Sequence, residues 1–276
     1  MIHNAEELLR LAAQTAQLRG RLDAEELQRI LRRAYQIAEN YNYDFQTNGE
    51  LHLLQRLARF GITAVFDVGA NIGEWTTLAL STFSGASVHS FEPIGETFGR
   101  LSAALGAEVR AQLFNFALWA EDGEISLRHY RENPGQTSAF EFPSPCAHED
   151  RVCVARSLDS FTAQAGVSHI DLLKIDVEGA EHKVLSGMTR LLAARAVRVI
   201  QFEYGFISIN TGFLLKDFYA TLGAAGFKVG KIYPHWVDFS DYSLEKENFI
   251  GPNFVAVLES EPEIIRTLAE YSGPAV

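Results

Sequence analysis

The spacing of apolar residues changes near residue 60, and this change divides the chain into two parts. Before it, apolar residues recur at intervals of three and four among Ala, Leu, Glu and Arg, as in amphipathic helices. The pattern predicts three helices, over residues 4–20, 23–41 and 49–59. Residues 1–60 are therefore expected to form an N-terminal helical extension that covers the core, caps a site or makes a dimer contact.

After residue 60, short apolar runs alternate with helical patterns. The runs predict strands at residues 63–68, 86–92, 107–118, 170–176, 197–205, 227–234 and 253–260. Such alternation is typical of a parallel sheet that is covered by helices on both faces. Residues 119–156 interrupt it with two added strands around a loop rich in proline and glycine. We therefore predict one α/β domain over residues 61–276.

Polar residues and glycines stand where the predicted strands end. They are Asp67, Gly69, Asn71 and Gly73 after the first strand, then Glu92, Asn115, Asp176 and Glu203 after later ones. In an open parallel sheet, ligands bind beyond the carboxyl ends of the strands. A core strand gains nothing from a carboxylate near its buried end, because desolvating the charge is unfavourable. The sequence therefore predicts a ligand site at this edge of the sheet.

The turn after the first strand and the acid after the second indicate a cofactor that contains adenosine. Gly69 and Gly73 allow the backbone to approach a ligand and the next helix to pack on the strand. Glu92 stands where an acid can accept hydrogen bonds from both hydroxyls of a ribose. Glu74, just inside the helix, would repel the pyrophosphate of NAD. S-adenosylmethionine has an amine, a sulfonium and no phosphate, so the charges favour it.

The segments that carry these residues resemble the successive motifs of the FkbM family of S-adenosylmethionine-dependent methyltransferases. They are "VFDVGANIGEWT", "SFEP", "FNFALWAEDGEISL", "SLDSF", "IDLLKIDVEGAEHKVLSGM" and "IQFEYG", in this order between residues 63 and 204. The resemblance implies a Rossmann-like class I methyltransferase fold, with a mostly parallel seven-stranded sheet, an antiparallel C-terminal strand and extra N-terminal helices outside the match. It also implies O-methylation, typically of a hydroxyl on a sugar, a glycan or a polyketide-type product.

The resemblance further implies roles for individual residues toward the cofactor. The expected contacts are Asp67, Gly69, Ala70, Asn71 and Gly73 around the methionine portion, Thr76 at its carboxylate, Glu92 and Pro93 at the ribose, Asn115, Ala117 and Leu118 at the adenine, and Asp176 between cofactor and acceptor.

Methyl transfer to a hydroxyl requires an in-line approach of the acceptor oxygen and help in removing its proton. The residues predicted for this chemistry are Asp176, Glu203 and His235, from a wider set that adds Glu178, Glu181 and His182. Asp176 and Glu203 end adjacent strands and would also suit Mg²⁺, although the prediction includes no metal. Three alternatives stay open: a non-catalytic module that binds a nucleoside cofactor, a NAD-type oxidoreductase, and a base N-methyltransferase, although "KIDVEGAE" lacks the prolines expected for the last of these.

Composition narrows the partners. The net charge of −11 disfavours a broad nucleic-acid surface, which needs clustered Lys and Arg. Cys146 and Cys153 lack metal-binding spacing and are expected to be free thiols. Glu6 and Glu7 do not fit a signal peptide, and no apolar run approaches the roughly 20 residues of a membrane span. We therefore expect a cytoplasmic protein that acts on a small molecule or glycan, with a homodimer through the N-terminal helices as a further expectation.

Overall fold

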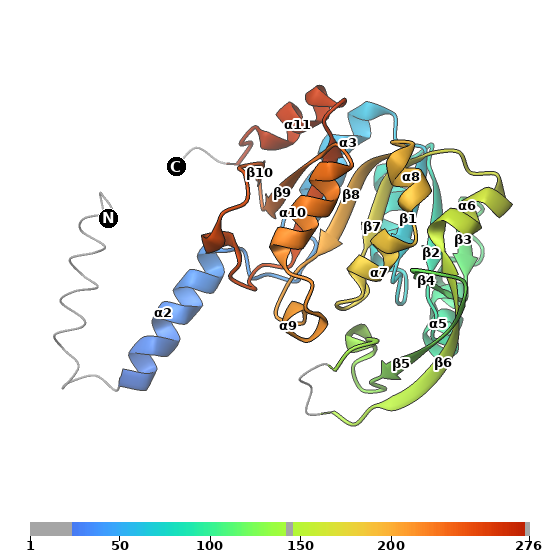
Figure 1. The fold of residues 1–276 in the computed structure, drawn as a ribbon, viewed down its shortest axis with the longest axis horizontal. Coiled ribbons are helices and arrows are strands. Elements are labelled where there is room, and N and C mark those ends of the chain that lie inside the picture. Colours follow the sequence, from blue (N-terminus) through green and yellow to red (C-terminus); the bar gives the residue numbers. More distant parts are fainter. Residues whose placement is uncertain (1–23, 142–145, 274–276) are drawn as a thin grey trace.

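A computed structural model of the chain describes residues 24–141 and 146–273, so the predicted helix over residues 4–20 lies outside the described residues (Figure 1). The main sheet has eight strands in the order β10-β9-β11-β8-β7-β1-β2-β3. These strands are β1 (Ala64–Val68), β2 (Ser87–Phe91), β3 (Ala111–Phe114), β7 (Ile170–Ile175), β8 (Val197–Glu203), β9 (Phe227–Tyr233), β10 (Trp236–Asp238) and β11 (Asn253–Leu258).

Most of this sheet is parallel, as predicted. β1 pairs in parallel with β2 and with β7, and β8 is parallel to β7. β11 runs antiparallel to both β8 and β9, which confirms the antiparallel C-terminal strand. The sheet has one strand more than the seven expected, because Pro234 and His235 turn the chain back and β10 pairs with the end of β9.

Helices cover both faces of the sheet, because successive side chains of a strand point to opposite faces. Phe66 on β1 joins the core under α6, α7, α8 and α10, whereas Val65 joins the core under α3, α4, α5 and α11. Full burial of a side chain of this size contributes about 1.5–3 kcal/mol. The helices are α2 (Ala24–Ala38), α3 (Glu50–Leu57), η1 (Ala58–Phe60), α4 (Glu74–Thr82), α5 (Gly95–Leu105), η2 (Pro134–Gln136), α6 (Leu158–Ala165), α7 (Glu181–Ser186), α8 (Thr189–Ala193), α9 (Ser208–Thr211), α10 (Leu215–Ala224), η3 (Leu244–Lys246) and α11 (Pro262–Ala269).

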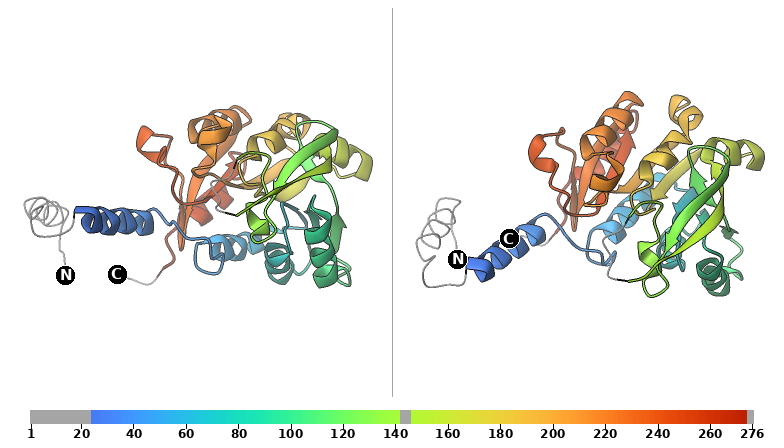
Figure 2. Two further views of the ribbon diagram at one scale, coloured as in Figure 1. Left: turned by 90° about the horizontal axis from the view of Figure 1, so that it is seen from below. Right: turned by 60° about the horizontal axis from the view of Figure 1, so that its bottom comes forward.

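A three-stranded sheet occupies the segment that interrupts the alternation, and it forms a separate layer beside the main sheet (Figure 2). Its strands are β4 (Ala117–Trp119), β5 (Gly123–His129) and β6 (Glu149–Ser157). The strand expected over residues 107–118 is therefore two strands, β3 in the main sheet and β4 in the small one. Asn115 lies at the break, where its Nδ2 donates hydrogen bonds to the carbonyl oxygens of Glu92 and Pro93 at 2.9 and 3.1 Å.

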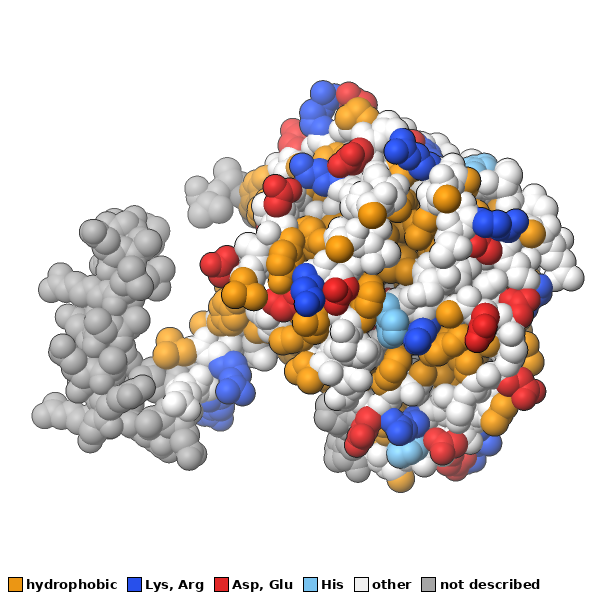
Figure 3. Space-filling view, viewed as in Figure 1, with side chains coloured by type: hydrophobic (Ala, Val, Ile, Leu, Met, Phe, Trp, Pro, Cys, Tyr) orange, Lys and Arg blue, Asp and Glu red, His pale blue; other side chains and the backbone are white. Residues whose placement is uncertain are grey.

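The two described helices of the predicted N-terminal extension, α2 and α3, pack differently against the rest of the protein. α3 packs on the sheet with Leu53, Leu54 and Leu57 buried. α2 projects from the body of the molecule, and its apolar side chains Ile30 and Ile37 are exposed (Figures 1 and 3). The division of the chain at residue 60 stays a prediction. Among the described residues, no helix combines the length and the apolar character that crossing a bilayer requires.

Candidate functional site

The turn between β1 and α4 has an unusual backbone that brings it against β7. Gly69, Asn71 and Gly73 all have positive φ, at 86°, 47° and 92°. A Cβ on Gly69 would lie 1.8 Å from the carbonyl oxygen of Asp176, and one on Gly73 would lie 2.7 Å from Leu101 Cδ1. The two glycines therefore serve close packing of chain on chain. Their conformation leaves Ala70 and Asn71 lining a cavity.

This first cavity has a volume of about 260 Å³ and lies at the carboxyl ends of β1, β2, β7 and β8. Its walls include most of the residues predicted for the cofactor or the chemistry, namely Gly69, Ala70, Asn71, Glu92, Pro93, Ala117, Leu118, Asp176 and Glu203. Five predicted residues do not line it: Asp67, Gly73, Thr76, Asn115 and His235. The sequence thus predicted at which edge of the sheet the cavity lies, and most of the residues predicted for the site line its wall.

Glu92 is held in place before any ligand binds. Its side chain is 7% exposed, and its carboxylate accepts hydrogen bonds from the backbone N–H groups of Ile94 and Asn71 at 2.9 and 3.1 Å. Burial raises the pKa of Glu92 to about 7, against the effect of these two hydrogen bonds. An acid in this position can be charged at neutral pH and accept further hydrogen bonds from a ligand.

Asp67 and Thr76 act on each other, and neither lines the cavity. Asp67 is fully buried and accepts a hydrogen bond from the Thr76 hydroxyl at 2.7 Å, while Thr76 also lies 2.8 Å from the Ser90 hydroxyl. Burial raises the pKa of Asp67, and Lys174 and the Thr76 hydrogen bond oppose that shift. The structure therefore gives Thr76 a partner inside the protein, where the sequence suggested a contact with the ligand.

Lys174 is a member of the site that the sequence-based set of site residues did not include. Its ammonium group lies 2.7 Å from Asp176 Oδ2, 3.9 Å from Asp67 Oδ1 and 5.6 Å from the centre of the Trp75 ring. Burial acts to lower the pKa of Lys174, but the charges of Asp176 and Asp67 outweigh it and raise the pKa. The signal in the sequence was its position two residues before Asp176, on the same face of the strand.

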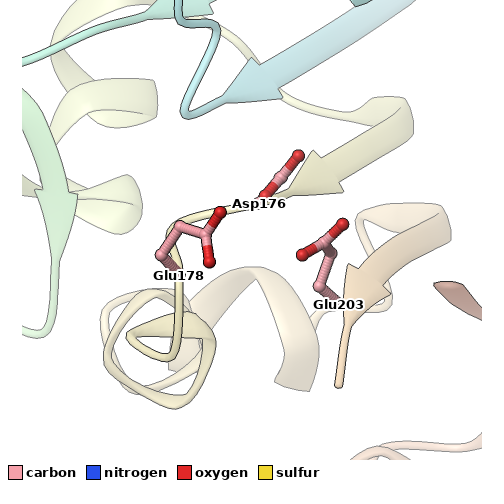
Figure 4. A group of neighbouring side chains, drawn as sticks. All are labelled: Asp176, Glu178 and Glu203. Atoms are coloured by element: carbon pink, nitrogen blue, oxygen red, sulfur yellow. The ribbon is translucent and has the colours of Figure 1, made fainter. Parts of the chain in front are cut away.

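Asp176, Glu178 and Glu203 form a cluster of carboxylates between the ends of β7 and β8 (Figure 4). One carboxylate oxygen of each lies within 4.8 Å of the other two. Burial raises the pKa of both Glu178 and Glu203 well above the usual value, and the charge of Asp176 raises each further. A positive group among these carboxylates would relieve their repulsion, whether it belongs to a substrate or is a cation such as Mg²⁺.

A second cavity, of about 610 Å³, adjoins the first. The two share Tyr43, Gly135, Glu178 and Glu203 as wall residues. The second cavity is also lined by Tyr41, Asn133, Gln136, Gly179, Glu181, Tyr204, Gly205, Phe206, Ile207 and Pro252. Most of these residues lie in loops or short turns, which periodicity cannot place. Their signal in the sequence is local composition, such as the aromatic run "YNYDF" that follows α2.

His235 does not reach either cavity, because it lies on the turn between β9 and β10. Its ring centre lies 6.1 Å from those of both His52 and Tyr271, and its carbonyl oxygen accepts a hydrogen bond from Ser272 at 3.2 Å. The structure therefore brings Asp176 and Glu203 together and leaves His235 apart from them.

Two polar atoms in the wall of the first cavity have no hydrogen-bond partner within the described residues. They are Asn71 Oδ1 and Trp75 Nε1, both buried. Buried polar groups are nearly always satisfied, so a ligand with a donor and an acceptor fits here. The wall also offers Glu92 for hydroxyls and the apolar Leu118 and Phe91 for a flat ring. This set of groups suits S-adenosylmethionine, which has an amine, a carboxylate, a ribose and an adenine.

Comparisons with known proteins match a region of the chain that includes the ends of β1, β2, β7 and β8. The family described as "Methyltransferase FkbM domain" matches residues 67–229. The chain is 30% identical over 154 residues to the 31-O-demethyl-FK506 methyltransferase FkbM of Streptomyces tacrolimicus, a match that covers 45% of this chain and 58% of that protein. It is 27% identical over 158 residues to the 2-O-methyltransferase NoeI of Sinorhizobium fredii, over 51% of this chain and 62% of that protein. The chain thus spans less than two thirds of both relatives. A solved FkbM methyltransferase from Methylobacillus flagellatus KT gives a TM-score of 0.47 at 14% identity, over 71% of this chain and 44% of that one.

Proposed function

Since the chain belongs to the FkbM methyltransferase domain family, we propose that it uses S-adenosylmethionine to methylate a hydroxyl of a sugar, a glycan or a polyketide-type product. The observation that carries this proposal is the junction of the two cavities at Glu178 and Glu203. A cofactor in one cavity and an acceptor in the other would meet beside carboxylates. Both of these relatives are named for methylation at an oxygen, which supports a hydroxyl as the acceptor.

The residues that would hold the cofactor are those that line the first cavity. Glu92 would accept hydrogen bonds from the ribose hydroxyls, and Leu118 would border the adenine. The unpaired atoms Asn71 Oδ1 and Trp75 Nε1 would form hydrogen bonds with the methionine portion. Glu74 lines the cavity at the start of α4. A carboxylate there disfavours a pyrophosphate, which argues against the NAD-type alternative.

In this proposal the side chains of the protein position the acceptor and remove the proton of its hydroxyl. Bound S-adenosylmethionine supplies a methyl group on a positively charged sulfur. Lys174 fixes Asp176 at 2.7 Å, so that the end of β7 presents a defined surface to the acceptor. Much of the acceleration of a direct transfer comes from such positioning. A carboxylate of the cluster accepts the proton that the hydroxyl must lose.

The second cavity is the proposed acceptor site. Among its described wall residues there are aromatic side chains and carboxylates and no Lys, Arg or His. Tyr41 and Tyr43 meet edge to face with their ring centres 5.2 Å apart. Aromatic faces suit the apolar face of a sugar ring, and carboxylates suit its hydroxyls.

The first test is calorimetric titration with S-adenosylhomocysteine and, separately, with NAD. Micromolar binding of the former alone supports the proposal and leads to a screen of glycosides and macrolide-like alcohols. We expect Asp176→Asn to lower turnover far more than it weakens binding of S-adenosylhomocysteine. Cofactor binding without turnover on any hydroxyl acceptor would favour the non-catalytic module, and binding of NAD alone would favour the oxidoreductase.

A further inference from the structure

The two cavities meet at a place that is rich in negative charge. Direct transfer requires the sulfur, the methyl group and the acceptor oxygen to lie in one line, so the reacting atoms must lie where the cavities meet. Of the four residues that line both cavities, Glu178 and Glu203 are the two with ionisable carboxylates. Their position alone therefore puts them beside the transferred group, if the proposed function is right.

The basic side chain at the cavities, that of Lys174, is already paired with a different carboxylate. Lys174 is the one basic side chain among the described residues that line either cavity. It pairs with Asp176 at 2.7 Å and lies 3.9 Å from Asp67. Within the described part of the chain, the carboxylates of Glu178 and Glu203 make no hydrogen bond and no ion pair. The two carboxyls of the junction therefore have no paired cation of their own, and a positively charged ligand there would favour their charged forms.

We propose that Glu178 and Glu203 recognise the positive charge of the sulfonium and then receive the proton of the acceptor hydroxyl when that charge disappears. The inference rests on the proposed function. The C–S bond breaks and its electron pair stays on sulfur, while a lone pair of the acceptor oxygen forms the new C–O bond. The proton leaves that oxygen for a carboxylate oxygen of the pair. The net charge at the junction is therefore the same before and after the reaction. The positive charge is first on sulfur and afterwards on the proton that the carboxylate has accepted.

The same argument predicts how the protein distinguishes substrate from product. S-adenosylmethionine and S-adenosylhomocysteine share their amino acid, ribose and adenine, and they differ in one methyl group and one positive charge. Glu92 faces the shared part and should weaken or strengthen both ligands equally. Glu178 and Glu203 face the part that differs, so they should control the ratio of the two affinities.

The preference for the charged ligand should also depend on pH. Burial and the charge of Asp176 raise the pKa of Glu178 and Glu203, so both carboxylates can hold protons near neutral pH. Binding of a cation favours their charged forms and must release protons. The charged and titratable groups that act on the pair are Asp176, Lys174, Glu181, Glu50 and Tyr43. All of these groups are present in both complexes, so the change of the ratio in variants of Glu178 and Glu203 reports on the pair.

The experiment is calorimetric titration of the full chain with each ligand at pH 6 and pH 8.5, in EDTA and in two buffers of different ionisation enthalpy. At pH 8.5 we expect S-adenosylmethionine to bind about tenfold more tightly than S-adenosylhomocysteine, with a smaller ratio at pH 6. Its binding near neutral pH should release protons. In the Glu178→Gln/Glu203→Gln double variant the ratio should fall toward one, and the proton release with S-adenosylmethionine should fall to the level seen with S-adenosylhomocysteine, which reports on Glu92 alone. The matched variant Glu92→Gln should weaken both ligands and keep the ratio.

Equal affinities in the wild type, or an unchanged ratio in the double variant, would overturn the assignment. The single variants Glu178→Gln and Glu203→Gln give the same readout if the double variant does not fold. Glutamine nearly keeps the shape of the side chain and removes its negative charge, and Glu92→Gln controls for the change from an acceptor oxygen to an amide. A wild-type protein that binds neither ligand would contradict the proposed function itself, which is a different outcome from binding both equally.

Discussion

Replacement of Lys174 by methionine should destabilise the fold, because the ammonium group neutralises an acid that has no access to water. Asp67 is fully buried, and its Oδ1 lies 3.9 Å from Lys174 Nζ, while Asp176 Oδ2 lies 2.7 Å away and is partly exposed. With an effective dielectric constant of about 20, these separations correspond to attractions of about 4 and about 6 kcal/mol. Desolvation of the three charges offsets most of that attraction. Removal of one partner from a buried pair typically costs about 3–5 kcal/mol, because the other charge stays buried without compensation.

The measurement is urea unfolding of wild type and Lys174→Met at pH 8.5 and pH 5.5. Without the lysine the pKa of Asp67 in the folded protein rises further above its value in the unfolded chain. A group whose pKa is raised by folding contributes stability at low pH and loses it as the pH rises through the folded-state value. The free-energy loss should therefore be about 3–5 kcal/mol at pH 8.5 and clearly smaller at pH 5.5.

The control is the double variant Lys174→Met/Asp67→Asn, which removes the acid as well as its partner. It should recover part of the stability lost at pH 8.5, because asparagine needs no counter-charge. A loss below about 1 kcal/mol in Lys174→Met, or a loss that is equal at both pH values, would refute the view that Lys174 compensates a buried charge.

Four further outcomes follow from the geometry. Gly69→Ala should unfold the protein or destabilise it severely, because φ is +86° and the new Cβ would lie 1.8 Å from a backbone carbonyl oxygen, whereas Gly85→Ala, with open space around it, should keep a normal melting temperature. Tyr41→Ala should raise the KM for the acceptor and leave the affinity for S-adenosylhomocysteine unchanged, since Tyr41 lines only the second cavity; a loss of that affinity in calorimetry would argue against separate sites. His235→Ala should leave kcat unchanged, and a tenfold or larger fall would return this residue to the site. Binding of S-adenosylhomocysteine should strengthen as the pH rises through about 7, the pKa of Glu92, because the charged carboxylate accepts the ribose hydrogen bonds; equal affinity at pH 6 and 8 would contradict that role.

The sequence predicted the parts of the site that depend on strands. Glu92, Asp176 and Glu203 lie at strand ends, and the parallel pairing of β2, β1, β7 and β8 brings those ends to one edge of the sheet. That inference needs only the alternation of apolar runs and helices. The turn of Gly69 was also predictable, although the structure shows that the space it opens is taken by the backbone of Asp176.

Other parts of the site depend on contacts between distant segments, and no periodic pattern encodes them. Tyr43 and Gly135 are far from each other in sequence, yet both line the two cavities. Thr76 stands at the predicted place on α4, but its hydroxyl faces inward because Asp67 lies behind it at 2.7 Å. Histidine is a residue type that can remove a proton, so His235 was predicted for the chemistry. It lies instead on the turn between β9 and β10, and β10 was not among the predicted strands.

The arrangement of the strands also explains why one carboxylate of the cluster is paired and two are not. Lys174 and Asp176 are two residues apart along β7 and its end, so their side chains lie on one face and meet at 2.7 Å. Glu203 ends the neighbouring strand, and Glu178 follows in a left-handed conformation at φ 51°, which turns its carboxylate back toward the same space (Figure 4). Each acid reaches the junction by a different route through the backbone, and only Asp176 has a cation on its own strand. Environments that differ this much let neighbouring acids take different roles, one orienting and the others exchanging a proton. Under the proposed mechanism, in which the site accepts a cation and afterwards a proton, the two unpaired glutamates are needed as much as the paired aspartate.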